Sequence, residues 1–311
     1  MIESQLNIEE FFRELRQKGK VVTTAWPLGA SFSPLDAGLV EEKGYLFSPC
    51  LIDFIDLDIV QKELSLLKVI MFEAVGSTNS EMLDLAKSNS VNRTLCFSEF
   101  QYAGRGRRGR KWVSPYGRNL ALSIGFETER PISTVSGLSL VAGLAIADTL
   151  KSLGIFNVRL KWPNDLIVKG IKLAGILVEL LEKENSRAVV VGVGVNVDIS
   201  DREEKLIDQA ITDVRSEGIK ISRTQLLCEL VASVELEITR FLTVGFAPFL
   251  SRYESLLAYR DEYCYLLVGN RILCEGILLG VNMIGELRIR TKDGTKTFGA
   301  GEVSLRRSLN S

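Results

Sequence analysis

The sequence predicts an α+β protein with a short N-terminal domain and a small C-terminal β-barrel. Between residues 68 and 197, short apolar segments are separated by turn residues, which is typical of strands. Two longer segments, 136–153 and 222–242, carry apolar residues at the spacing of a helix. From residue 263 onward the chain holds only short strand-like segments, which favour a barrel of about 45 residues.

The composition limits the kind of protein. A chain of 311 residues suggests two or three domains, and a net charge of −1 gives no general attraction to nucleic acid or acidic membranes. No apolar run approaches the roughly 20 residues that span a bilayer, and the acidic start is unlike a signal peptide. The five scattered cysteines predict free thiols in a reducing cytoplasm rather than disulfides or zinc sites.

The chain contains no histidine. Its absence excludes catalytic triads that need histidine, the histidine-based motif of zinc proteases and imidazole proton shuttles. An enzyme built from this sequence must therefore act through positioning, through cations, or through an oxygen-bound metal.

Residues 1–65 are the least regular part of the chain. A helix is expected at 8–17, where Phe11, Phe12 and Leu15 share one face and Gly19 provides the stop. A short strand is expected at 44–47 and a second helix at 58–66.

Residues 66–262 alternate between strands and helices. Capping boxes at 78–81 and 222–225 predict helices that run to about 88 and 242. Further helices are expected at 136–153, ended by Gly154, and at about 246–258. Strands are expected at 68–72, 95–99, 120–126, 157–162, 166–168, 172–181 and 188–197. The last is almost wholly apolar and is therefore expected at the centre of a sheet. In the C-terminal part, turns are expected at 269–270 and 293–294.

Residues 104–112 (Gly-Arg-Gly-Arg-Arg-Gly-Arg-Lys-Trp) concentrate five cations and three glycines. Glycine lets a backbone approach a ligand closely, and the planar arginine fork suits carboxylates and phosphates. This basic loop is therefore a candidate anion clamp. The alternative is a solvated or RNA-binding Arg-Gly tract.

A second motif, residues 161–165 (Lys-Trp-Pro-Asn-Asp), places two polar side chains after a strand that is ended by proline. These side chains can face a cleft or form only an Asx-turn. Lys172 is the one cation of the apolar segment 171–178. It can serve a site or simply extend to solvent from the strand end.

Two further motifs lie at the ends of elements. Residues 192–196 (Gly-Val-Gly-Val-Asn) lack the last glycine of a dinucleotide fingerprint. They can end a strand against a ligand, with Asn196 contacting a polar group. Residues 76–79 (Gly-Ser-Thr-Asn) belong to a helix cap, and a helix N-terminus also offers donors to a small ligand.

These motifs, in this order and at these spacings, resemble the biotin protein ligases, the biotin–[acetyl-CoA-carboxylase] ligase family. The resemblance runs from about residue 68 to the C-terminus and includes 76–79, 101–112, 161–165, 172–179 and 192–196. It implies a catalytic domain at 66–262 like those of class II aminoacyl-tRNA synthetases, with a mixed, mostly antiparallel sheet. It also implies an SH3-like barrel at 263–311 and an N-terminal domain at 1–65.

The resemblance also implies a reaction. The family joins biotin to ATP, with Mg²⁺, to give biotinoyl-5′-adenylate and pyrophosphate, and then passes biotin to a lysine of the biotin carboxyl carrier protein. No tightly bound prosthetic group is implied. A reaction between two anions needs cations and magnesium rather than histidine. Because the adenylate is open to hydrolysis, we expect the basic loop to be mobile without ligand and to order over the intermediate.

Site residues follow from the same resemblance. The implied catalytic residues are Lys172, Arg105 and Arg107. The implied biotin-binding residues are Ser77, Thr78, Asn79, Gln101, Arg105, Gly106, Arg107 and Lys172. The implied nucleotide-binding residues are Arg107, Trp112, Lys161, Asn164, Asp165 and Asn196. Some family members pack a tryptophan on adenine, and the corresponding segment 208–212 has none here.

The N-terminal residues raise the question of a second activity, because some family members carry a winged helix-turn-helix there and repress biotin synthesis genes. Only one of the three helices of such a domain is evident, at 8–17. Residues 1–47 hold seven acidic and five basic residues, and this balance disfavours contact with DNA phosphates. A degenerate domain that packs on the ligase domain is favoured over operator binding, no membrane partner is expected, and a homodimer is left open.

Three alternatives compete with this interpretation. A lipoate–protein ligase has a similar fold and reaction but characteristically carries a histidine near its glycine-rich motif. A regulator that only senses biotinoyl-adenylate is disfavoured by the acidic N-terminal part and by the intact Lys172. An Arg-Gly RNA-binding protein leaves the other motifs unexplained.

Overall fold

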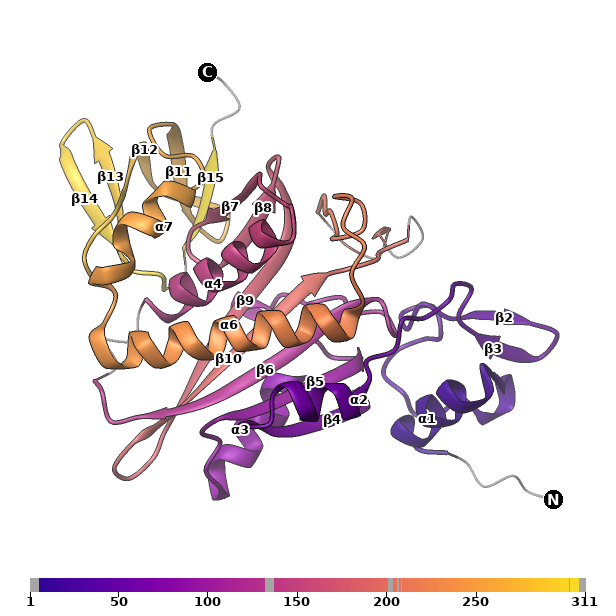
Figure 1. Cartoon of the computed structure of the whole chain (residues 1–311). Coiled ribbons are helices and arrows are strands. Elements are labelled where there is room, and N and C mark those ends of the chain that lie inside the picture. Colours follow the sequence, from indigo (N-terminus) through magenta and orange to yellow (C-terminus); the bar gives the residue numbers. More distant parts are fainter. Residues whose placement is uncertain are drawn as a thin grey trace.

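The protein, shown in Figure 1 as a computed structural model, is built around three β-sheets. The structure describes residues 6–131, 137–200, 204–205, 207, 209–301 and 303–307. The expected helix start at residue 136 and residue 208 lie outside these ranges. Within them, no helix has the length and apolar character needed to cross a membrane.

The N-terminal part combines one α-helix with a three-stranded sheet. Helix α1 (Ile8–Lys18) begins at Asn7, whose side chain accepts from the N–H of Glu10, and ends at Gly19 with φ of 74°. Strands β1 (Lys20–Val22), β2 (Val40–Glu42) and β3 (Tyr45–Phe47) pair in the order β1-β3-β2. The predicted helix and strand are confirmed. Within residues 6–56, α1 is the one α-helix, so this described part lacks the helix pair of a helix-turn-helix.

The N-terminal part packs directly on the main sheet. The ring of Phe12 on α1 lies 4.9 Å from Phe100 and 4.8 Å from Tyr116, and Phe32 stacks on Tyr102 at 5.2 Å between centroids. Since Phe12, Phe100 and Tyr116 are all buried, the two parts share one hydrophobic cluster.

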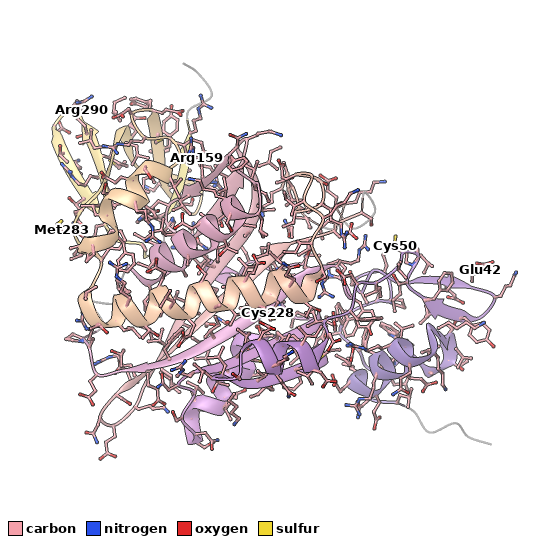
Figure 2. All side chains as sticks on the ribbon, viewed as in Figure 1. Glu42, Cys50, Arg159, Cys228, Met283 and Arg290 are labelled. Atoms are coloured by element: carbon pink, nitrogen blue, oxygen red, sulfur yellow. The ribbon has the colours of Figure 1, made fainter. Side chains whose placement is uncertain are left out.

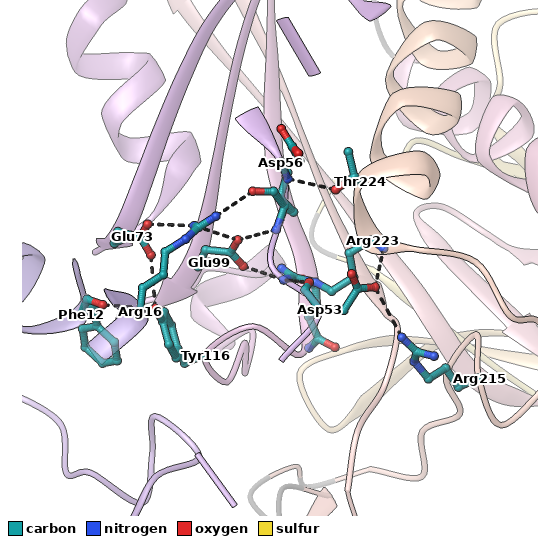
Figure 3. A network of polar contacts seen from close by, with 12 residues as sticks. Phe12, Arg16, Asp53, Asp56, Glu73, Glu99, Tyr116, Arg215, Arg223 and Thr224 are labelled. Carbon is teal, nitrogen blue, oxygen red and sulfur yellow. Dashed lines mark hydrogen bonds and ion pairs between the residues drawn. The ribbon is translucent and has the colours of Figure 1, made fainter. Parts of the chain in front are cut away.

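A buried polar network joins the same two parts (Figure 3). Arg16 of α1 donates to Glu73 at 2.8 Å, and Glu99 accepts from Arg223 at 2.5 Å. Arg223 is 1% exposed and also donates to the carbonyls of Asp53 and Asn119. Burial raises the pKa of Glu73, an effect that the Arg16 cation opposes.

The main sheet has seven strands in the order β4-β5-β6-β10-β9-β8-β7. Strands β4 and β5 pair in parallel and the other neighbours pair antiparallel, so the predicted mixed, mostly antiparallel sheet is confirmed. As expected, the apolar strand β10 lies at the centre. The strands are β4 (Lys68–Val75), β5 (Thr94–Gln101), β6 (Asn119–Thr128), β7 (Val158–Lys161), β8 (Asp165–Val168), β9 (Ile171–Glu182) and β10 (Arg187–Asn196).

Helices cover the two faces of this sheet. Helices α4 (Leu138–Ser152) and α6 (Arg223–Val244) pack on one face against Val189, Val191 and Val193 of β10. Helix α3 (Thr78–Ser88) packs on the other face, where Ala188 and Val190 meet its apolar side. Since successive strand residues point to opposite faces, the continuous apolar run of β10 serves both layers.

Some predicted helix boundaries are wrong. Helix α2 (Leu57–Glu63) ends earlier than expected, and the predicted helix at 246–258 is a 3₁₀ turn, η4 (Ala247–Phe249), followed by α7 (Leu250–Leu256). The start of α6 at Ser222 is confirmed, because its side chain accepts from the N–H of Gln225. The capping box at Thr78 is not formed. Thr78 is the first helical residue, and its hydroxyl bonds to Gln101 instead.

The C-terminal part is a five-stranded antiparallel sheet in the order β14-β13-β12-β11-β15. Its buried residues, among them Leu266, Leu278 and Ile289, belong to the same hydrophobic cluster as α4 and α6. Closure of this sheet into an SH3-like barrel stays a prediction. The strands are β11 (Tyr263–Val268), β12 (Arg271–Val281), β13 (Leu287–Thr291), β14 (Gly294–Phe298) and β15 (Ser304–Arg307).

All five cysteines are free thiols. Cys50 is exposed beside the N-terminal sheet and Cys228 lies on α6, as labelled in Figure 2. The remaining three are buried, and burial raises the pKa of the Cys264 thiol to about 11.

Candidate active site

A cavity of about 120 Å³ opens on the α3 side of the main sheet. It is lined by the start of α3, the basic loop, the turn between β7 and β8, strands β9 and β10, and the C-terminal strand β15. Twelve of the thirteen predicted site residues line it: Ser77, Thr78, Asn79, Gln101, Arg105, Gly106, Arg107, Trp112, Lys161, Asn164, Asp165 and Lys172. The thirteenth, Asn196, does not.

The first turn of α3 forms a neutral polar end of the cavity. Gln101 accepts from the N–H of Thr78 at 2.8 Å and from its hydroxyl at 3.2 Å. The hydroxyl of Ser123 lies 2.5 Å from Oδ1 of Asn79. Thr78 and Asn79 are each 3% exposed. These side chains are therefore held rigidly, with hydrogen-bonding groups at the cavity wall.

Two glycines of β10 make room for the site. A Cβ on Gly192 would lie 2.2 Å from Oδ1 of Asn79, and a Cβ on Gly194 would lie 2.3 Å from the ring of Trp112. The motif Gly-Val-Gly-Val (192–195) therefore presents its valines to the α4 and α6 layer and its bare backbone to Asn79 and Trp112. The sequence predicted that these glycines let a ligand approach the strand end. In the structure they make room for the side chains of Asn79 and Trp112.

The basic loop is folded against the sheet. The N–H of Trp112 donates to the carbonyl of Gly104 at 2.9 Å, and the N–H of Gly106 donates to Arg110 at 2.7 Å. Gly104 allows no side chain, since a Cβ there would lie 2.3 Å from the carbonyl oxygen of Trp112. Arg108 adopts a left-handed conformation with φ of 64°.

Each of the three predicted catalytic cations has a protein partner. Lys172 lies 2.7 Å from Asp165, and Arg105 forms an ion pair with Glu179. Arg107 donates to Oδ1 of Asn164 at 3.0 Å and to the carbonyls of Ala300 and Gly301 in the C-terminal part. Burial lowers the pKa of Arg107.

The polar residues on the two sides of Pro163 have distinct tasks. The side-chain amide of Asn164 donates to the carbonyl of Ile176 on β9 at 2.8 Å, so this residue does more than form a local Asx-turn. Lys161 is largely buried, and burial together with the nearby Arg306 cation lowers its pKa.

Asn196 has a structural position outside the cavity. It is 2% exposed, and its amide donates to the carbonyl of Thr212 at 3.1 Å. The side chain therefore holds the segment that follows β10 against the sheet.

Sequence reasoning missed the contribution of the C-terminal strand. Ser304, Leu305 and Arg306 line the cavity, as does Gln209 from the segment after β10. The basic pair at 306–307 was the only signal in the sequence, and nothing local indicated that β15 lies beside the cavity. Arg108, Arg110 and Lys111 of the basic loop also line the cavity.

The charge of the cavity is strongly asymmetric. Among its described lining residues Asp165 is the one carboxylate, whereas eight are cationic: Arg105, Arg107, Arg108, Arg110, Lys111, Lys161, Lys172 and Arg306. Such a concentration of cations in a partly buried space favours a ligand with several negative charges. The neutral polar end at α3 suits an uncharged head group with N–H and C=O groups.

The chain matches known proteins over most of its length. Residues 71–196 match the Biotin/lipoate A/B protein ligase family. The chain is 37% identical to the bifunctional ligase/repressor BirA of Salmonella typhimurium over 88% of this chain and 84% of that protein. It is 34% identical to the biotin–[acetyl-CoA-carboxylase] ligase of Mycobacterium tuberculosis over 73% of this chain and 85% of that protein.

A solved structure supports the same assignment. The biotin protein ligase of Aquifex aeolicus in complex with biotin and ATP is similar with a TM-score of 0.65 and 29% identity. The similarity covers 78% of this chain and 99% of that one. From its cavity, its fold and these matches, the chain belongs to the biotin protein ligase family.

Proposed function

We propose that this protein activates biotin with ATP and transfers it to a lysine of the biotin carboxyl carrier protein of acetyl-CoA carboxylase. One observation carries the proposal: a single cavity joins a neutral polar end to a cluster of eight cations. Biotin has an uncharged ureido head and a carboxylate tail, and ATP brings three phosphates. The cavity offers complementary groups for both substrates.

The neutral end is assigned to the ureido head of biotin. Ser77, Thr78, Asn79 and Gln101 would bind it, and the backbone of residues 105–107 would cover it. The carboxylate would then extend toward Lys172. All of these groups line the same cavity, which supports a shared role.

The cationic end is assigned to ATP and to the chemical step. A carboxylate oxygen of biotin attacks the α-phosphorus, and the bond from that phosphorus to the β-phosphate oxygen breaks, releasing pyrophosphate. Lys172, now beside Asp165, would stabilise the negative charge that develops on the transferring phosphate. The amine of the carrier lysine then attacks the acyl carbon, loses a proton, and displaces AMP.

Mg²⁺ fits this cavity as a companion of the nucleotide. Protein sites for Mg²⁺ often supply one or two carboxylates and leave the remaining positions to phosphates and water. Asp165 is the carboxylate at the cavity wall, and among the described residues no cluster of three or more acidic or cysteine ligands forms a separate metal cage. The metal would neutralise phosphate charge.

Biotin-dependent exchange of labelled pyrophosphate into ATP tests the proposal directly. We expect exchange in the wild-type protein and its loss, by at least about a hundredfold, in Lys172→Ala. Absence of exchange in the wild type would overturn the assignment. Lipoate in place of biotin tests the lipoate-ligase alternative, which the relatives described above do not favour.

Operator binding is not part of this proposal. Residues 6–56 contain one α-helix, and that helix packs on Phe100 and Tyr116 rather than presenting a free recognition surface. A gel-shift assay with biotin-operon DNA, biotin and ATP checks this expectation, and a specific shift would contradict it. The proposed domain boundaries remain 1–65, 66–262 and 263–311.

A further inference from the structure

Glu179 of β9 contacts two parts of the biotin site at once. Its Oε2 atom accepts from Nδ2 of Asn79 at 2.9 Å and also pairs with the guanidinium of Arg105. Asn79 belongs to the wall of the cavity, whereas Arg105 belongs to the loop that covers it. The side chain of Glu179 is 26% exposed and that of Arg105 40% exposed; Arg105 lines the cavity, whereas Glu179 lies outside its lining.

The contact with Asn79 determines which way its amide faces. Both N–H groups of the amide have acceptors, Glu179 Oε2 and the carbonyl of Leu177 at 3.2 Å. Neither acceptor can donate, so the amide nitrogen must face β9. The Oδ1 atom then accepts from Ser123 and keeps one lone pair for a ligand. Asn79 is thereby fixed as an acceptor, which is the group that an N–H of a ureido head requires.

The contact with Arg105 fastens the loop. Arg105 is bridged to Lys111 within the basic loop, and its side chain reaches across to a strand that is 74 residues away in the chain. Its guanidinium therefore pairs with Glu179, while Arg105 also lines the cavity. An ion pair of this kind adds to the backbone contacts that place the loop beside β9.

We propose that Glu179 is a positioning residue for biotin activation, which orients Asn79 toward the ureido head and latches the loop through Arg105. This inference rests on the proposed function. One carboxylate thus serves both the binding of biotin and the retention of the adenylate. The two roles have different chemical requirements, since orientation of Asn79 needs an acceptor and the latch needs a negative charge.

Two substitutions separate these roles. Glu179→Ala removes both the acceptor and the charge, and Glu179→Gln keeps an acceptor without the charge. Arg105→Met removes the guanidinium that pairs with Glu179 and leaves the contact between Glu179 and Asn79 in place. Glu182→Gln is the matched control, because Glu182 lies on the same strand and pairs with Arg187, which does not line the cavity.

The readouts are the KM for biotin in pyrophosphate exchange and the rate at which preformed adenylate escapes from the protein. We expect Glu179→Ala to raise the KM for biotin by about tenfold or more, with a smaller change in kcat. Glu179→Gln should raise that KM clearly less. Both Glu179 variants and Arg105→Met should release adenylate several-fold faster than the wild-type protein. The double variant Arg105→Met with Glu179→Gln should release it little faster than either single variant.

Distinct results would overturn the inference. A folded Glu179→Ala variant with the wild-type KM for biotin and the wild-type rate of adenylate escape would contradict both roles of Glu179. Equal KM values for the Ala and Gln variants would show that Glu179 does not orient Asn79. Additive effects on adenylate escape in the double variant would show that Glu179 and Arg105 do not act together on the loop. Absence of pyrophosphate exchange in the wild-type protein would contradict the proposed function. Normal exchange in the wild-type protein, together with Glu179 variants whose KM and adenylate escape are unchanged, would contradict this inference alone.

Discussion

Substitution of Gly192 by alanine should weaken biotin binding through Asn79. The added Cβ would lie 2.2 Å from Oδ1 of Asn79, and ordinary contact begins near 3.4 Å, so the amide must retreat by about 1.2 Å. That shift lengthens three hydrogen bonds of 2.5, 2.9 and 3.2 Å beyond useful range. With about 0.5–1.5 kcal/mol for each bond, the loss of folding stability is about 1.5–4.5 kcal/mol. Biotin affinity should fall by about tenfold, because the displaced Oδ1 no longer meets the ligand.

Calorimetric titration with biotin measures this loss directly, and thermal unfolding confirms that the variant is folded. Gly299→Ala is the control, because among the described residues no atom beyond its two chain neighbours lies within 4 Å of a Cβ at that position. Gly194→Ala is the comparator, since its Cβ meets Trp112 and leaves Asn79 untouched. A folded Gly192→Ala variant with wild-type affinity for biotin would show that Asn79 does not bind the ligand in its present orientation.

Four further predictions concern the loop, the buried network and the titrating groups. Protease should cleave the basic loop of the free protein and spare it with biotin and ATP, and equal cleavage would contradict a closing lid. Arg223→Met should lower the free energy of unfolding in urea by about 3–5 kcal/mol, because it leaves Glu99 buried with one partner fewer; a change below about 1 kcal/mol would contradict this. The KM for ATP should rise at alkaline pH as Lys161, whose pKa is lowered, loses its charge, and Lys161→Arg should move that rise to higher pH. The folded-state pKa of Glu73 is raised, so binding of its proton favours the folded state. Its contribution to the free energy of unfolding should therefore fall as pH rises from 4.5 through the raised pKa, and Glu73→Gln should abolish this part of the pH dependence.

The elements of the main sheet could be predicted because each carries its own periodic pattern. The strands at 120–126 and 188–197 and the helix at 222–242 were expected at nearly the positions in which they occur. The capping box at Thr78 could not be judged locally. The hydroxyl of Thr78 forms hydrogen bonds with Gln101 and Ser123, which are distant in sequence. These tertiary partners replace the local cap.

The candidate site shows the same division. Motifs with unusual chemistry, such as the basic loop and the segment around Asn164, carried the resemblance that implied the twelve lining residues. The resemblance assigned Asn196 to the nucleotide, and in the structure its amide is turned toward Thr212. The direction of a side chain at a strand end depends on the segment that packs over it, which the sequence motif does not contain.

By itself, the sequence determined the chemistry that the protein can perform. The lack of histidine, the cationic loop and the ordered motifs limit it to a reaction that depends on positioned cations, because side-chain type sets charge and hydrogen-bonding capacity. Only the tertiary structure decided which groups meet. The return of β15 to the cavity, the fit of Asn79 and Trp112 over two glycines, and the shared carboxylate of Glu179 all join segments far apart in the chain. Such contacts arise when the layers pack, and no local pattern encodes them.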